Sequence, residues 1–267
     1  MKNILILLFT VLLFTACENK GNFEIETVNV TITLPDEIHN GEEFEIIAKP
    51  EQAIPIKEAV FYLNGEEIGK STEIIAKIKY TAEDLEPGTY TISCKYKPIE
   101  NLYIIEGEDI TKLALRLGDP YLGGKIFILN ADGKSGLVAT EKDLVNNSVE
   151  LFTWGTSEFA GTTNDNGAEN TVIMAAKSDS PYSAAYMFKD NHNYNGYADW
   201  YIPSIDELKM LQANKQYLSN FTTGVAYWSS SESDAANAYG LIVTNNDNNP
   251  SLYSKSKNCK VRPIRVF

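Results

Sequence analysis

Cysteine, histidine and basic side chains are scarce in this chain of 267 residues. No two of its three cysteines have metal-ligand spacing, and the two histidines, His39 and His192, lie far apart in polar segments. We find no Ser-His-Asp or Cys-His arrangement that indicates nucleophilic catalysis. Lys and Arg number 23 against 36 Asp and Glu, giving a formal net charge of −13. This charge argues against a nucleic-acid partner, because phosphate binding needs clustered basic side chains.

The apolar run near the N-terminus is too short to cross a membrane. Residues 4–16 follow Met1-Lys2-Asn3 and fall below the about 20 apolar residues that a spanning helix needs. Their length is typical of the hydrophobic region of a secretory signal. The run ends Leu-Phe-Thr-Ala-Cys, with the cysteine at position 17, which resembles the bacterial lipobox.

This resemblance implies that residues 1–16 are a signal peptide removed before Cys17, which then carries the lipid. Two or more acyl chains would anchor the protein stably in a membrane, with residues 17–25 as a tether. We therefore expect a lipid-anchored protein of the bacterial envelope, at the outer membrane or cell surface. An ordinary signal peptide with an incidental cysteine is the alternative.

Residues 26–117 are predicted to form short strands separated by turns. Apolar and polar side chains alternate from Val28 to Leu34, which is the period of a half-buried strand. Asn64-Gly65, between two such runs, predicts a tight hairpin because both residues tolerate positive φ. About six strands at this spacing predict an all-β sandwich. The hairpin and residues 85–92 resemble bacterial immunoglobulin-like domains, which implies a spacer; direct ligand binding by this domain is the alternative.

From residue 118 onward, loops rich in Gly, Asn, Ser and Trp dominate, so we place a domain boundary there. Residues 124–129 and 136–140 predict a hairpin. A helix is expected to begin near residues 168–173. Pro181 can occupy the first turn of another helix, whose inner face would carry Ala184, Ala185 and Phe188. Ser204 and Glu207 predict a capping box that begins an amphipathic helix over 204–214.

Three motifs follow in order within this second half. They are G-Y-A-D-W-Y-I-P-S-I-D-E-L at 196–208, Y-W-S-S-S-E at 227–232 and V-R-P-I-R at 261–265. Together they resemble the C-terminal domain of the Lcl collagen-like adhesins and related bacterial surface domains. The resemblance implies that residues 118–267 form an α+β C-type lectin-like domain whose two ends meet in one sheet. It also implies a cell-surface location and, in some members, binding of glycans such as sulfated polysaccharides.

This sequence departs from the family pattern in two places. Tyr201 stands where the family has Arg, and Ala184-Ala185-Tyr186 stands where a cysteine is common. The acidic net charge also argues against sulfated, polyanionic glycans.

We expect the motif residues to be structural rather than ligand-binding. Trp200 and Trp228 are predicted core aromatics. Arg262 and Arg265 are expected to share one face of the last strand and to pair with acids such as Asp199 or Glu232. The full structural set is Asp199, Trp200, Pro203, Glu207, Trp228, Arg262 and Arg265.

The binding candidates lie in loops. Calcium takes six to eight oxygen ligands, and two clusters of side-chain oxygens occur, at residues 164–166 and 245–249. A calcium site at Asn245 and Asp247 is therefore one interpretation, and plain turn chemistry is the other, since the Glu-Pro-Asn, Gln-Pro-Asp and Trp-Asn-Asp signatures of lectins are missing. Nearby loop aromatics either stack on a sugar or pack under the loops. The candidate ligand-binding residues are Trp154, Asn164, Asp165, Asn166, Tyr194, Tyr197, Asp247 and Asn248.

The sequence thus predicts a non-enzymatic binding protein or adhesin. Lipid on Cys17 would hold it to a membrane, and the lectin-like head would recognise a glycan or a surface protein. One alternative is a structural component of the envelope or of fimbrial assembly. The other is an enzyme with the formylglycine-generating fold, which depends on active-site cysteines and a metal, whereas this head has only Cys259. If Cys17 is lipidated, Cys94 and Cys259 are expected to be separate buried thiols, with a disulfide between them as the alternative.

Overall fold

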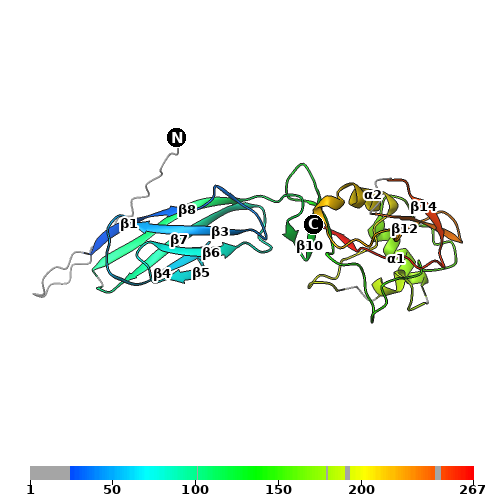
Figure 1. Cartoon of the computed structure of the whole chain (residues 1–267), viewed down its shortest axis with the longest axis horizontal. Helices are drawn as coiled ribbons and strands as arrows, with labels where there is room; N and C mark the ends of the chain where they lie inside the picture. Colours follow the sequence, from blue (N-terminus) through cyan, green and yellow to red (C-terminus); the bar gives the residue numbers. More distant parts are fainter. Residues whose placement is uncertain (1–24, 101, 179, 190–192, 244–247) are drawn as a thin grey trace, which may run out of the picture.

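The computed structural model describes residues 25–100, 102–178, 180–189, 193–243 and 248–267. Cys17 and the two proposed calcium ligands, Asn245 and Asp247, lie outside the described residues. The chain is mostly β, and its two β-rich halves follow one another end to end (Figure 1). No helix among the described residues is long and apolar enough to cross a membrane.

The described residues of the first domain form strands and no helix, as the sequence predicted. Seven pair in the order β5-β4-β7-β8-β1-β3-β6, and β2 pairs with β8. Strand β1 changes partner along its length: residues 26–29 run parallel to β8, and residues 30–33 run antiparallel to β3. The chain thereby passes between two groups of strands, which enclose a core that includes Phe44, Phe61 and Ile92. The strands are β1 (Glu26–Thr33), β2 (Glu37–Ile38), β3 (Glu43–Pro50), β4 (Ile56–Leu63), β5 (Glu66–Ser71), β6 (Ala76–Thr81), β7 (Gly88–Pro98) and β8 (Tyr103–Leu113).

The hairpin predicted at Asn64-Gly65 joins β4 to β5. Asn64 has φ 46° and Gly65 has φ 89°, so both occupy the left-handed region that the turn requires. The Asn64 side chain also accepts a hydrogen bond from the Thr91 amide at 2.9 Å, which fixes the turn to strand β7.

Strand β8 is not among the strands that the sequence predicts. Its apolar alternation is broken by Glu106-Gly107-Glu108-Asp109, and Ile110 is exposed. The strand is nevertheless central, because it pairs with both β7 and β1. A Cβ at position 107 would collide with the carbonyl oxygen of Val30, so the close approach of β1 requires glycine there.

The second domain has two small sheets and two α-helices. Its first sheet has the order β15-β11-β10-β9, so the last strand pairs with β11, near the start of the domain, and both ends meet in one sheet. Strands β10 and β11 form the hairpin predicted by the sequence. The second sheet has the order β12-β13-β14. The strands are β9 (Pro120–Tyr121), β10 (Gly124–Leu129), β11 (Gly136–Ala139), β12 (Tyr227–Glu232), β13 (Asn237–Leu241), β14 (Ser251–Ser254) and β15 (Ile264–Val266).

The helices are α1 (Gly167–Lys177) and α2 (Ile205–Ala213), with short 3₁₀ helices η1 (Ala185–Phe188) and η2 (Lys215–Tyr217). The predicted capping box of α2 is confirmed. The Ser204 hydroxyl accepts from the Glu207 amide, and the Glu207 carboxylate accepts from the Ser204 amide at 2.8 Å. The prediction for Pro181 was wrong, because η1 begins only at Ala185, with Ala184 as its N-cap.

Both described cysteines are free and buried, so the expectation of separate thiols is confirmed for Cys94 and Cys259. Burial raises the pKa of Cys94 to about 12, and burial likewise raises the pKa of Cys259 to about 11. Each thiol therefore stays protonated at neutral pH and behaves as a small apolar side chain.

Polar contacts join the loops of the first domain to the start of the second. Arg116 pairs with Glu42 of the first domain and with Asp119 beyond the last strand of that domain. The Leu122 amide donates to the carboxylate of Asp84 at 2.7 Å. The junction near residue 118 is thus held from both sides rather than being an unattached linker.

Candidate functional site

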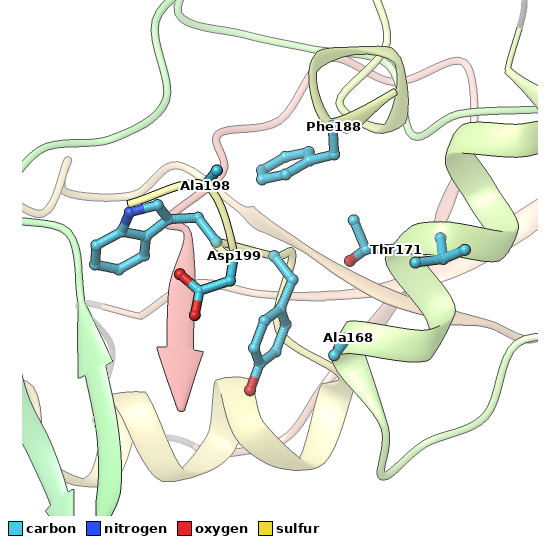
Figure 2. A pocket seen from close by; sticks show the side chains of 8 residues that line it. Ala168, Thr171, Phe188, Ala198 and Asp199 are labelled. Atoms are coloured by element: carbon cyan, nitrogen blue, oxygen red, sulfur yellow. The ribbon is translucent and has the colours of Figure 1, made fainter. Parts of the chain in front are cut away.

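A hollow of about 170 Å³ lies in the second domain between α1, η1 and the segment that carries the Asp-Trp motif. Figure 2 shows Ala168, Thr171 and Phe188 on one side and Ala198 and Asp199 on the other. Val172, Trp200 and Tyr201 complete the wall. Most of the lining is apolar, and Asp199 is the only acidic or basic residue among these eight.

Asp199 is fixed by Arg265 of the last strand. Arg265 Nε lies 2.7 Å from Oδ1 of Asp199, and a terminal nitrogen of the same guanidinium lies 2.9 Å from Oδ2. The guanidinium also donates to the carbonyl of Leu122 and lies 4.2 Å from the ring centroid of Tyr197. A planar fork suits this two-point contact. The expectation that the two arginines pair with acids such as Asp199 or Glu232 is thus confirmed for Arg265. The Asp199 side chain is still 60% exposed.

Arg262 does not behave as predicted. It pairs with Asp143 at 2.7 Å rather than with Glu232, and its guanidinium lies 4.2 Å from the ring centroid of Phe221. Only Arg265 lies on the last strand, because β15 begins at Ile264 and Arg262 precedes it. The spacing also excludes a shared face, since residues on one face of a strand are two apart and these arginines are three apart.

Glu232 instead forms a buried ion pair with Lys255, with 2.7 Å between Oε2 and Nζ. Its carboxylate also accepts from three consecutive amides, those of Ala160, Gly161 and Thr162. Burial alone would raise the pKa of Glu232, but hydrogen bonds from the Ala160 amide, from Lys255 and from the other two amides together lower it. The pair therefore fixes the loop at residues 160–162 and leaves neither charge available to a ligand.

Glu207 connects the hollow to both helices. Its Oε1 accepts from the Tyr201 hydroxyl at 2.8 Å, and its Oε2 accepts from the Gly167 amide at 3.1 Å, at the start of α1. The Thr171 hydroxyl accepts from the Ile202 amide at 2.9 Å, which ties α1 to the motif segment. These contacts fix opposite walls of the hollow relative to one another.

Trp154, predicted as a ligand-binding aromatic, is fully buried, and its indole N–H donates to the carbonyl of Ser229 at 2.7 Å. That prediction was wrong, and the alternative of packing holds. Tyr194 and Tyr197 are half-buried; Tyr194 packs edge-on against Trp200, with 5.7 Å between ring centroids, and Tyr197 lies against Arg265. Neither lines the hollow. Trp200 and Trp228 are core residues, as predicted.

The first predicted oxygen cluster serves the helices. The Asn166 side chain accepts from the Glu169 amide at 3.0 Å as the N-cap of α1. The carbonyl of Asn164 accepts from the Asp206 amide at 3.1 Å, and Asp165 is exposed. Asn248 is also exposed. Within the described residues no three His, Cys, Asp or Glu side chains gather as metal ligands, and calcium stays a prediction.

The sequence missed most of the hollow. Ala168 and Val172 carry no chemical signature, and they reach the Asp-Trp segment only because α1 packs beside it. Phe188 was predicted to face inward, and it forms part of the wall. Asp199, Trp200 and Tyr201 also line it, and all three belong to the motif at residues 196–208 that the sequence singled out.

The three sequence motifs, at residues 196–208, 227–232 and 261–265, all lie within a region that matches a family model. Residues 143–265 match the Lcl C-terminal domain. The matched region begins at Asp143, which holds Arg262, and ends at Arg265, which holds Asp199. The two ion pairs that tie the last segment to the rest of the second domain thus lie within the match.

No curated protein matches the chain. Among solved structures, fibronectin(III)-like modules of CbhA from Clostridium thermocellum are 22% identical, with a TM-score of 0.27, covering 32% of this chain and 93% of theirs. The PKD domain of an M14-like peptidase from a Thermoplasmatales archaeon is 22% identical, with a TM-score of 0.25, covering 32% of this chain and 94% of that one. A CARDB domain from Pyrococcus furiosus is 17% identical, with a TM-score of 0.26, covering 36% and 100% respectively. Because these TM-scores are low, the fold of the first domain is defined by its own strand pairing and not by its likeness to these structures.

Proposed function

We propose that this chain is a lipid-anchored bacterial surface protein with a non-enzymatic binding head. In this proposal Cys17 carries the lipid, residues 26–117 form an immunoglobulin-like spacer, and residues 118–267 form a C-type lectin-like head that recognises a glycan or a surface protein. The observation that carries the proposal is the match of residues 143–265 to the Lcl C-terminal domain.

Two features of the fold support this assignment of roles. The first and last strands of the head region meet in one sheet, as the lectin-like fold requires. The spacer and head are joined by the Arg116–Asp119 ion pair and by the hydrogen bond from the Leu122 amide to Asp84, which suits a stalk that presents a binding domain away from a membrane.

The chemistry of the head supports a role without catalysis. Its one cysteine, Cys259, is buried, and its raised pKa of about 11 disfavours the thiolate that a reactive cysteine needs. The buried acids Glu232 and Asp143 are paired with Lys255 and Arg262, so neither is a free general base.

A glycan array tests the binding role. The chain from Glu18 onward would be applied with calcium and again with a chelator, alongside the Asp247→Ala variant. Binding that needs calcium and disappears in Asp247→Ala supports a calcium lectin; binding insensitive to the chelator supports a lectin without metal. Absence of binding in both conditions rejects the glycan ligand and leaves a protein partner or an assembly role.

Lipid anchoring is tested separately in a bacterial host. Metabolic labelling with a radioactive fatty acid should mark the full-length chain, and Cys17→Ser should abolish both the label and recovery in the membrane fraction. Cys259→Ser is the matched control. Because the Cys259 thiol is buried in the head, its replacement should leave labelling unchanged. Equal labelling of the wild type and Cys17→Ser would overturn the anchor.

A further inference from the structure

We propose that the hollow between α1, η1 and Asp199 binds one uncharged, hydroxyl-rich ring, such as the terminal residue of a neutral glycan. This inference rests on the proposed role of the second domain as a binding head, and it names the site and the ligand class. None of the loop residues that the sequence singled out for ligand binding lines this hollow.

Size is the first argument. The hollow has a volume of about 170 Å³, well below the roughly 300–1,000 Å³ of sites for drug-sized ligands. A ligand that filled this volume would displace about six water molecules, at roughly 30 Å³ each in the liquid. That space fits a single six-membered ring with its substituents, and not a peptide side-chain cluster or an extended oligosaccharide.

The lining matches a ligand with one apolar and one polar side. Ala168 and Phe188 present carbon atoms from the two helices, and Asp199 lies on the opposite side of the hollow, with its carboxylate turned toward Arg265 of the last strand (Figure 2). A sugar ring has this character, because its C–H groups pack on carbon surface while its hydroxyls donate to an acceptor. Each carboxylate oxygen has two acceptor positions, so Asp199 can accept from a hydroxyl while it stays paired with Arg265.

Charge decides between ligand classes. No basic side chain lines the hollow, so a sulfate or carboxylate on the ligand would find no cationic partner there. A cationic ligand is also disfavoured, because Arg265 already neutralises Asp199 through two hydrogen bonds. An uncharged hydroxyl donor is the class that this wall accepts without an unpaired charge.

The hollow is open to solvent, and hydrogen bonds hold its walls in place. Val172 is 70% exposed, and Ala168 and Ala198 are exposed, so a ring can enter from solvent. Behind them, the hydrogen bonds of Tyr201 to Glu207 and of the Ile202 amide to Thr171 hold the wall in place. A fixed site loses little entropy on binding, which raises the affinity that a small ligand with few contacts can reach.

The experiment is a titration of the ¹⁵N-labelled chain from Glu18, followed by amide chemical shifts. The probes are the methyl glycosides of glucose, galactose and mannose, galactose 6-sulfate, and choline. We expect at least one neutral glycoside to shift amides of residues 168–172 and 198–201 with millimolar affinity. Galactose 6-sulfate and choline should bind at least about tenfold more weakly than that glycoside.

Two matched substitutions on α1 locate the site. Ala168→Tyr places a ring in the hollow and should weaken binding at least about tenfold, whereas Ala176→Tyr adds the same ring at an exposed position outside the wall and should leave the affinity unchanged. Asp199→Asn should also weaken binding while keeping the side-chain shape. Circular dichroism and thermal unfolding confirm that each variant is folded.

Some outcomes overturn the inference without touching the proposed function. Preferred binding of galactose 6-sulfate or choline, or equal affinity in Ala168→Tyr and Ala176→Tyr, removes the hollow as a neutral-ring site even if the array finds glycan binding. Shifts confined to other residues do the same. A protein that binds no glycan on the array and shifts with no glycoside fails both tests.

Discussion

Arg265 and Asp199 lie 66 positions apart in the chain and meet through two hydrogen bonds, of 2.7 and 2.9 Å. Arg265 comes from the last strand, and Asp199 precedes the tryptophan of the motif at residues 196–208. The contact closes the domain at its C-terminal end and also fixes the only acidic or basic residue of the hollow. One ion pair thereby links the stability of the second domain to the chemistry of its candidate site.

Arg265→Lys should lower the free energy of unfolding by about 2 kcal/mol, because Lys keeps the charge but loses the two-point contact and the stacking on Tyr197. Denaturant unfolding of the chain from Glu18 measures this. Lys209→Ala, which breaks a surface pair with Asp206, should cost under about 1 kcal/mol. Equal effects of the two substitutions would show that the Arg265 pair has no special structural role.

Glu232→Gln should lower the free energy of unfolding at neutral pH by about 3 kcal/mol, because it leaves the buried Lys255 ammonium without a counter-charge. The pKa of Glu232 is lowered from its ordinary 4.5 in the folded protein, so its ionisation stabilises the fold above about pH 4.5. That stabilisation is lost as pH falls through the lower folded-state value. The difference between wild type and variant should therefore shrink below about pH 4.5.

Unfolding titrations at neutral and acidic pH measure that difference. Asp234→Asn is a useful control, because the pKa of Asp234 is also lowered, but mainly by hydrogen bonds from Asn237 and Ala236 to an exposed carboxylate rather than by a buried ion pair. If the difference in free energy of unfolding between the wild type and Glu232→Gln stayed constant through the acidic range, the proposed role of Glu232 ionisation would be contradicted.

Cys94 and Cys259 should not react with Ellman's reagent in the folded chain from Glu18, because both thiols are buried and their pKa values are raised to about 12 and about 11. In denaturant both should react, giving two thiols per chain. Ser256→Cys, at an exposed position, should add one reactive thiol to the folded protein. A denatured, unreduced chain with no reactive thiol would show a disulfide instead.

Gly107→Ala should destabilise the first domain by about 2 kcal/mol or more, because the added Cβ collides with the Val30 carbonyl and separates β1 from β8. Thermal unfolding measures the loss. Gly88→Ala is the matched control, since a Cβ there meets nothing within 4 Å, and its melting temperature should stay close to that of the wild type. A similar melting temperature for both variants would mean that β1 moves away without cost.

Local sequence features predicted local structure well. The Asn64-Gly65 hairpin, the Ser204–Glu207 capping box and the hairpin over residues 124–140 each depend on neighbouring residues, and each is confirmed. The burial of Trp200 and Trp228 was also predicted, because large aromatic side chains are highly buried on average.

What the sequence alone determined was therefore the all-β first half, the main turns and caps, and the motif match of the second half. The tertiary structure decided which acid each arginine meets, the place of β8, the burial of Trp154 and the walls of the hollow. These features depend on segments tens of residues apart that touch only after the chain has folded. Hydrophobic period and turn chemistry act over a few residues, so they carry no information about which distant side chain becomes a partner.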